Sequence, residues 1–214
     1  MQYSTVLSGG MLALACLACA VAIGKARKRY GEADQPALFC ALLGFLLTAA
    51  AAAASVGEPS WQAAHLWLSQ ASSFLGLPLL GVAALALGRG WAWSRPNWGR
   101  VVLGLCAFFE LFRQMNLLED YRLLLNLATL LLIVYAGAIQ WPRRTPAYAA
   151  TVVVGLFLLG TLAVGSDGLI GPLRRTDLLQ AVLTPAYPLL AWLLLSLPGH
   201  AEDCVNRENP VKTL

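Results

Sequence analysis

Seven apolar stretches, separated by more polar segments, make up most of the chain and constrain its fold more than any other feature. An apolar helix of about 20 residues crosses the roughly 30 Å hydrocarbon core of a bilayer. Inside that core a helix satisfies its own backbone hydrogen bonds. The sequence therefore predicts an all-α fold, a polytopic membrane helical bundle of about seven transmembrane helices. The stretches are Thr5–Gly24, Pro36–Val56, Gln62–Leu87, Val101–Gln114, Tyr121–Gln140, Ala147–Gly165 and Asp177–Leu197.

The fourth stretch, Val101–Gln114, is the shortest and the most polar of the seven. If it did not cross the membrane, every later segment would lie on the opposite side from that expected. Composition supports the general class, because 58% of the residues are hydrophobic and only 12% are charged. Soluble domains carry about 25% charged residues. A water-soluble fold of this length could not bury so much apolar surface.

Basic residues occur mainly in every second connection between the apolar stretches. The positive-inside rule assigns such segments to the cytoplasm, which places the N-terminus outside and the C-terminus inside. Residues 1–197 are then a seven-helix transmembrane domain, and residues 198–214 a short cytoplasmic polar tail. The cytoplasmic side carries Lys25, Arg27, Lys28, Arg29, Arg89, Arg95, Arg100, Arg143, Arg144, Arg207 and Lys212, and the outer side carries Arg113, Arg122, Arg174 and Arg175.

Residue usage also indicates where such a bundle would reside. Arg greatly outnumbers Lys, and Ala and Leu dominate, which is typical of a GC-rich bacterial genome. Helical bundles of bacteria reside in the inner (plasma) membrane, whereas outer-membrane proteins are usually barrels. The net charge of +4 does not indicate nucleic-acid binding, because the basic residues lie in short runs between apolar stretches. Membrane lipids are the expected surroundings.

A weak internal repeat relates the third and seventh stretches. Gln70 and the Pro78-Leu79-Leu80 triplet recur as Gln180 and Pro188-Leu189-Leu190, at an offset of 110 residues. This favours a 3+1+3 arrangement, in which the last three spans repeat the first three. Pro78 interrupts the third stretch, and Pro185 and Pro188 interrupt the seventh. Paired interruptions in two halves point to a substrate site near the midplane.

Four stripes of polar residues fall at helical spacing in the outer halves of the predicted spans. Charged and polar groups at membrane depth are costly, and they mark functional sites. If the stripes face one another, they line a polar cavity that opens to the outside. They comprise His65, Ser69, Ser72 and Gly76; Glu110, Arg113 and Gln114; Arg122, Asn126 and Thr129; and Asp177, Gln180, Thr184 and Tyr187.

Eight residues are the predicted ligand contacts, namely His65, Ser69, Gln70, Glu110, Arg113, Asn126, Asp177 and Gln180. Arginine at the cavity would favour a ligand with an anionic head group. A structural interpretation stands beside this one. Glu110 and Arg113 have ion-pair spacing on one helix and could simply neutralise each other.

Several kinds of chemistry lack the residues that they require. The chain has two histidines, His65 and His200, too few for a three-histidine zinc site, and they do not form a haem-ligand pair within the bundle. The last span has no lysine for a retinal Schiff base. Cys16 and Cys19 match C-x-x-C in the middle of an apolar stretch, where they are expected to pack as small residues. No cofactor and no metal are therefore predicted.

Three functional hypotheses remain. In the first, the cavity binds or transports a small polar or amphiphilic ligand, with an anionic lipid-like molecule as one candidate. In the second, the chain is an accessory or assembly subunit that packs against a membrane protein partner or forms a homo-oligomer. The third is an intramembrane lipid hydrolase, with His65 as general base, Glu110 or Asp177 as its carboxylate partner and Ser69 as nucleophile. Ser69 is one turn from His65 on the same helix, a poor geometry for attack, so an enzyme is the less favoured interpretation.

Overall fold

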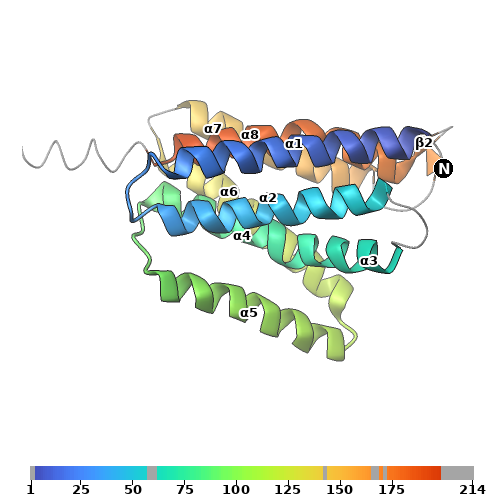
Figure 1. Cartoon of the computed structure of the whole chain (residues 1–214), viewed down its shortest axis with the longest axis horizontal. Coiled ribbons are helices and arrows are strands. Elements are labelled where there is room, and N and C mark those ends of the chain that lie inside the picture. Colours follow the sequence, from blue (N-terminus) through green and yellow to red (C-terminus); the bar gives the residue numbers. More distant parts are fainter. Residues whose placement is uncertain (1–2, 57–61, 142–143, 165–168, 171–172, 199–214) are drawn as a thin grey trace, which may run out of the picture.

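The computed structural model describes residues 3–56, 62–141, 144–164, 169–170 and 173–198, nearly all of them helical (Figure 1). Successive long helices run in opposite directions between the two ends of an elongated bundle. The α-helices are α1 Tyr3–Arg27, α2 Gln35–Val56, α3 Gln62–Ala71, α4 Leu77–Arg89, α5 Arg95–Gln114, α6 Leu118–Ile139, α7 Arg144–Leu158 and α8 Arg175–Ser196. Two π-helical segments, η2 Ser72–Gly76 and η3 Leu159–Val164, and a hairpin of two-residue strands, β1 Leu169–Ile170 and β2 Leu173–Arg174, complete the described elements.

Each predicted apolar stretch contains a long helix, and the prediction of an all-helical bundle is confirmed. Six helical segments within the described ranges are long and apolar enough to cross a membrane, so the chain is a multi-pass membrane protein. The third of these segments is the continuous run of α3, η2 and α4. Helix α5 is not among the six, and it carries the charged residues Arg95, Arg100, Glu110 and Arg113.

Helix α5 begins six residues before the predicted stretch because the preceding sequence contains start signals. Ser94 is the extended N-cap residue, with φ −63° and ψ 152°, and Pro96 lies in the first turn. Proline fits there because the first-turn N–H groups have no intrahelical partner. The turns on both sides of α5 contain left-handed residues, Gly90 at φ 63° and Asn116 at φ 55°. The chain can therefore reverse direction tightly at either end of this helix.

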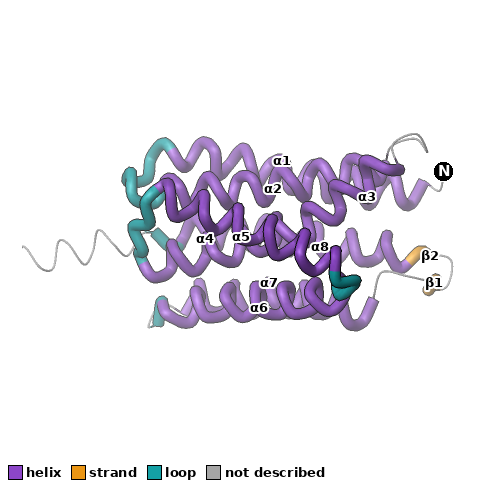
Figure 2. Tube along the Cα trace, turned by 90° about the horizontal axis from the view of Figure 1, so that it is seen from below, coloured by secondary structure: helices purple, strands orange, loops and turns teal. Residues whose placement is uncertain are grey.

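The bundle consists of two groups of helices, α1 to α4 and α6 to α8, and of one peripheral helix, α5. Helix α1 packs along α2 and α8, α4 packs against α2 and α6, and α7 packs against α6 and α8. Figure 2 shows α6 and α7 on the side of the bundle opposite α1 and α2. Helix α5 lies apart at the edge in Figure 1, and Trp98 is its one buried residue. Much of the surface of α5 is therefore free of contact with the other described helices.

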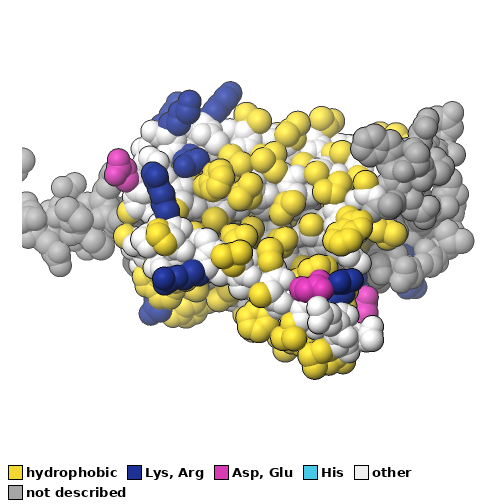
Figure 3. All heavy atoms as spheres, turned by 60° about the horizontal axis from the view of Figure 1, so that its bottom comes forward, with side chains coloured by type: hydrophobic (Ala, Val, Ile, Leu, Met, Phe, Trp, Pro, Cys, Tyr) yellow, Lys and Arg dark blue, Asp and Glu magenta, His cyan; other side chains and the backbone are white. Residues whose placement is uncertain are grey.

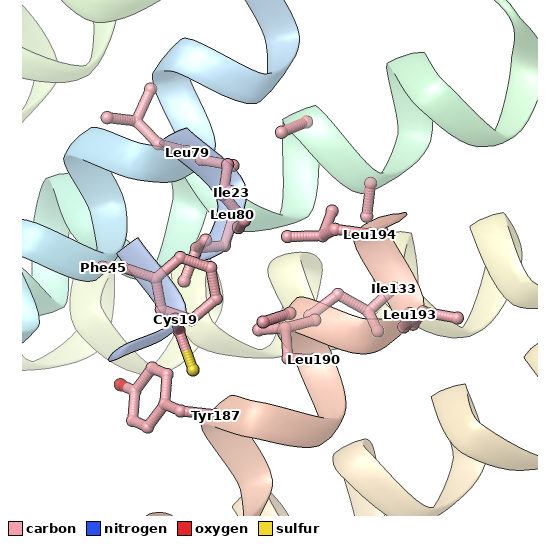
Figure 4. Packing of buried hydrophobic residues seen from close by; sticks show 14 of the residues in the cluster. Cys19, Ile23, Phe45, Leu79, Leu80, Ile133, Tyr187, Leu190, Leu193 and Leu194 are labelled. Atoms are coloured by element: carbon pink, nitrogen blue, oxygen red, sulfur yellow. The ribbon is translucent and has the colours of Figure 1, made fainter. Parts of the chain in front are cut away.

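The core lies where α1, α2, α4, α6 and α8 meet. Figure 4 shows Phe45, Leu80, Ile133 and Leu190 packed together from four of these helices, and none of the four side chains is exposed. Tyr187 joins this cluster through edge-to-face ring contacts, with its centroid 6.0 Å from that of Phe45. Apolar packing thus fills the middle of the bundle.

Glycines allow α4 to touch α6 at backbone distance. A Cβ atom placed on Gly81 would lie 2.6 Å from the Cγ2 atom of Thr129, and one placed on Gly88 would lie 3.1 Å from the Ala136 carbonyl oxygen. The two contacts are one heptad apart on both helices. Small residues are favoured at such crossings because they let backbones approach closely in the absence of water. The interface between the two groups of helices therefore depends on these positions.

The two ends of the bundle differ in charge. The N-terminal end is the end at which α1 begins; the opposite end is here called the basic end. Figure 3 shows most of the visible Lys and Arg side chains at the basic end, with apolar side chains covering much of the surface between the ends. The described basic residues at that end include Lys25, Arg27, Arg89, Arg95 and Arg144.

Candidate functional site

The eight predicted ligand contacts all lie toward the N-terminal end of the bundle, but they do not meet in one place. Asp177 and Gln180 face α1 and α2, whereas Glu110 and Arg113 lie on the exposed side of α5. His65, Ser69 and Gln70 lie along α3. Of the eight residues, Asn126 alone lines the cavity between η2, α6, η3 and α8. The expectation of a single cavity lined by all four stripes is therefore wrong.

Asp177 and Gln180 belong to a buried hydrogen-bond network between α1, α2 and α8. The Ser8 hydroxyl donates to the Gln180 Oε1 atom over 2.9 Å, and it lies 3.5 Å from an Asp177 carboxylate oxygen. The Gln180 Nε2 group donates to the Ser55 hydroxyl over 3.5 Å. Asp177 is 4% exposed and Gln180 is 9% exposed. These hydrogen bonds link three helices.

Replacing Gln180 by alanine is expected to lower the free energy of unfolding by about 1 kcal/mol, because interhelical hydrogen bonds in membranes contribute about that much. The variant Gln114→Ala is the control, since Gln114 is exposed and contacts only Glu110 on its own helix. Thermal unfolding in detergent measures both variants. Equal midpoints for the two would contradict a stabilising role for Gln180.

Glu110 and Arg113 form a bidentate ion pair on the exposed side of α5. The two guanidinium–carboxylate distances are 2.8 Å and 2.7 Å, and the side chains are 45% and 52% exposed. Gln114 donates a further hydrogen bond to Glu110 over 3.1 Å. The pair therefore neutralises itself within one helix. Arg113 and Gln70 border a hollow between α3, α5 and the start of α6, lined otherwise by apolar side chains.

The acid–base group predicted for a hydrolase is not assembled among the described residues. The buried Nδ1 atom of His65 has no hydrogen-bond partner there. Glu110 is engaged by Arg113, and Asp177 lies against Ser8. The Ser69 hydroxyl donates to the Leu66 carbonyl of its own helix over 2.9 Å. Among the described residues, no carboxylate or hydroxyl group is hydrogen-bonded to the Nδ1 atom of this imidazole.

A cavity of about 260 Å³ lies between η2, α6, η3 and α8, and we call it the central cavity. Its polar lining residues come from four helical segments, and apolar residues make up the rest of its lining. Leu123, at its edge, is 65% exposed, so the cavity reaches the surface of the bundle. The lining residues are Ser72, Ser73, Arg122, Asn126, Thr161 and Tyr187, together with Leu77, Leu123, Phe157, Leu179 and Leu183.

Two groups in the central cavity can recognise a ligand. The Oδ1 atom of Asn126 is buried and has no hydrogen-bond partner among the described residues. An unpaired buried acceptor is costly and calls for a donor. Arg122 lies one turn from Asn126 and pairs with Glu119 at 2.6 Å. That contact engages one edge of the guanidinium, which has five N–H donors in all. The cavity therefore offers one acceptor and, on an arginine whose charge is balanced by Glu119, further N–H donors.

A chain of hydroxyl groups continues from the cavity wall into the core. Ser72 donates to the Thr48 hydroxyl over 3.1 Å, and Thr48 donates to the Gly44 carbonyl over 3.0 Å. Tyr187 lies about 18 Å from the start of α8 at a rise of about 1.5 Å per residue, near the middle of that helix. The polar part of the cavity thus ends near the middle of the bundle, where the apolar core begins.

Both π-helical segments border the central cavity. Segment η2 contributes Ser72 and Ser73, and η3 contributes Thr161. Such segments are rare and occur frequently at functional sites, because the wider turn redirects side chains. The prediction that both the third and the seventh spans are interrupted is wrong for the seventh span. Helix α8 is continuous through Pro185 and Pro188, and the second interruption is η3 instead.

Ser73 and Thr161 were missed by the sequence reasoning. Ser73 lies next to the predicted stripe of the third span, and Thr161 is a single hydroxyl residue in an apolar run. Helical spacing assigns neither of them to a polar face, because it assumes an unbroken α-helix of 3.6 residues per turn. A π-helical turn changes that spacing locally.

Among the described residues, no three His, Cys, Asp or Glu side chains come together as a metal-binding group. Comparison with protein-family models, with curated protein sequences and with solved structures gives no match to this chain.

Proposed function

We propose that this membrane protein binds or transports a small acidic amphiphile whose head group enters the central cavity. The observation that carries the proposal is the buried Asn126 Oδ1 atom, which has no hydrogen-bond partner among the described residues, in a cavity that Arg122 also lines. An anionic group on the ligand would accept hydrogen bonds from Arg122. A hydroxyl on the ligand would donate to Asn126. Apolar lining residues such as Phe157 and Leu183 would cover the carbon chain.

The size of the central cavity limits the ligand. Pockets for drug-sized ligands usually measure about 300–1,000 Å³, and this cavity measures about 260 Å³. It suits a head group with the first part of an alkyl chain. The rest of a longer chain would extend past the exposed Leu123 toward lipid. A medium-chain hydroxy acid is the simplest compound with these properties.

The orientation proposed with this function places the N-terminal end outside and the basic end in the cytoplasm. The supporting observation is the concentration of Lys and Arg at the basic end, as in the positive-inside rule. In this proposal helix α5 also crosses the membrane, as the fourth of seven spans along the chain. Its 20 residues extend about 30 Å, enough to cross the core. The two helix groups on either side of α5 in the chain fit a 3+1+3 arrangement. The bacterial inner membrane remains the proposed location.

Thermal unfolding of the full chain in lipid nanodiscs tests the proposed ligand class. The probes are octanoate, β-hydroxyoctanoate and octanol, which share one chain length and differ in head group. A ligand that binds only the folded state raises the unfolding midpoint by mass action. We expect β-hydroxyoctanoate to stabilise most, octanoate less, and octanol not at all. Equal effects of all three would refute recognition of the acidic head group. If none of the three probes raised the unfolding midpoint and the protein purified in a stoichiometric complex, the accessory-subunit hypothesis would be favoured instead.

The variant Asn126→Leu separates the two head-group contacts. We expect it to lower the affinity for β-hydroxyoctanoate about tenfold, to the level of octanoate, because one hydrogen bond is lost. Without ligand, the variant should unfold at a higher temperature than the wild-type protein, because it no longer buries an unpaired acceptor. The control is Asn97→Leu at the exposed start of α5, which should alter neither property. If Asn126→Leu kept the wild-type ratio of affinities for β-hydroxyoctanoate and octanoate, Asn126 would not be part of the binding site.

A further inference from the structure

A larger hollow lies at the basic end, between α2, α5 and the end of α1. Its volume is about 620 Å³, and we call it the α2–α5 groove. It shares no lining residue with the central cavity. The walls are mainly apolar, with two arginines and one glutamine among the lining residues. The residues are Arg27, Gln35, Pro36, Phe39, Cys40, Leu43, Arg95, Trp98, Gly99, Val102 and Leu103.

The length of the groove matches one leaflet of a bilayer. Helices α2 and α5 both begin at the basic end, so their lining residues run in the same direction. The α2 wall extends from Gln35 to Leu43, and the α5 wall from Arg95 to Leu103. Eight residues of helix span about 12 Å. Half of a roughly 30 Å hydrocarbon core is about 15 Å, so the groove runs from the interface nearly to the midplane.

Charge is concentrated at one end of the groove. Arg27 lies in the last turn of α1, and Arg95 is the first residue of α5. Within the described ranges, the ion pairs of the chain are Glu110–Arg113 and Glu119–Arg122, so neither groove arginine is neutralised by a carboxylate there. The Arg27 guanidinium lies 5.0 Å from the ring centroid of Phe39 and is thereby held over the groove wall. Two unneutralised cations thus stand above an apolar channel.

We propose that the α2–α5 groove binds an anionic phospholipid of the cytoplasmic leaflet. The phosphate group would lie between Arg27 and Arg95, and one acyl chain would pass along Phe39, Leu43 and Val102. Basic pockets between transmembrane helices on the cytoplasmic side bind anionic head groups in this way. The lipid would fill the space between the peripheral helix α5 and the rest of the bundle. This site rests on the orientation given above and is independent of the ligand of the central cavity.

Native mass spectrometry of the full chain tests this site with three probes. They are phosphatidylglycerol, phosphatidylcholine with the same acyl chains, and soluble glycerol phosphate. Wild-type protein should bind phosphatidylglycerol at least about fivefold more tightly than phosphatidylcholine. Arg27→Gln and Arg95→Gln should each weaken phosphatidylglycerol binding about fivefold, the effect of one interfacial basic residue. Arg100→Gln is the control, because Arg100 lies one turn further along α5 and does not line the groove.

A steric pair of variants tests the apolar part of the same groove. A Cβ atom on Gly99 or on Gly104 would meet nothing within 4 Å, so both backbone positions have room for a side chain to begin. Gly99 lines the groove and Gly104 does not. We expect Gly99→Leu to weaken both lipids and Gly104→Leu to weaken neither. Three results would overturn the proposal: equal binding of both lipids, complete competition by glycerol phosphate, or a dimer of the chain that Gly99→Leu dissociates.

Discussion

Replacing Gly81 by valine is expected to lower the free energy of unfolding by about 3 kcal/mol, the upper part of the range for overpacking a core. A single added Cβ atom would already lie 2.6 Å from Thr129 Cγ2 and 3.2 Å from the Thr129 carbonyl oxygen. The carbonyl oxygen belongs to the backbone and cannot rotate away, so α4 and α6 would have to separate. Unfolding monitored by circular dichroism in mixed detergents measures the loss.

Gly155→Val provides the matched control for that variant. A Cβ atom on Gly155 would meet nothing within 4 Å. Valine is a somewhat better helix former than glycine, so Gly155→Val should be neutral or slightly stabilising. If Gly81→Val unfolded at the same detergent fraction as Gly155→Val, the close crossing of α4 and α6 would be contradicted.

Replacing Arg122 by glutamine is expected to reduce the affinity for an acidic amphiphile about tenfold. Octanol should stabilise neither this variant nor the wild-type protein. Hydrogen bonds to charged groups are stronger than neutral ones, and the partial exposure of Arg122, 41% of its side chain, keeps the effect at the lower end of their range. Glutamine retains hydrogen-bonding capacity but removes the charge. Isothermal titration with octanoate measures the change.

Arg113→Gln is an unusually close control for Arg122→Gln. Both arginines lie toward the N-terminal end of the bundle and pair with a glutamate three residues earlier on the same helix. Arg122 lines the central cavity and Arg113 does not. The octanoate affinity of Arg113→Gln should therefore equal that of the wild-type protein. A similar loss in both variants would indicate general attraction of anions to this end, without a defined site.

Much of the fold could be predicted because hydrophobic length is a local property of the sequence. The ends of α2 and α8 lie within two residues of the predicted limits. Helix α5 begins before the predicted limit at Val101. Its first turns contain the polar residues Arg95 and Asn97, which end the apolar stretch but are compatible with a helix. The π-helical turns escaped prediction because the sequence Ser72–Gly76 is compatible with an ordinary helix. In the structure the segment ends at Gly76, which lies close to Gly44 of α2.

The candidate site was predicted less well because helical spacing shows which residues share a face but not what that face contacts. Gln180 and Tyr187 share a stripe on α8, yet Gln180 contacts Ser8 on α1 and Tyr187 borders the central cavity. The neighbours of a residue on other helices depend on how each helix is rotated about its axis in the bundle. In a chain surrounded by lipid both the inward and the outward faces are apolar, so the apolar pattern does not predict that rotation. Asn126 and Arg122 are adjacent on one helix, so their proximity could be predicted.

An anomalous-scattering map of crystals grown with a terminally brominated β-hydroxyoctanoate tests the central claim most directly. The account predicts one strong bromine peak at the apolar side of the central cavity, near Leu183 and Phe157, with the carboxylate beside Arg122 and the hydroxyl beside Asn126. A bromine peak confined to the α2–α5 groove or the lipid-facing surface, with the central cavity empty, would contradict it.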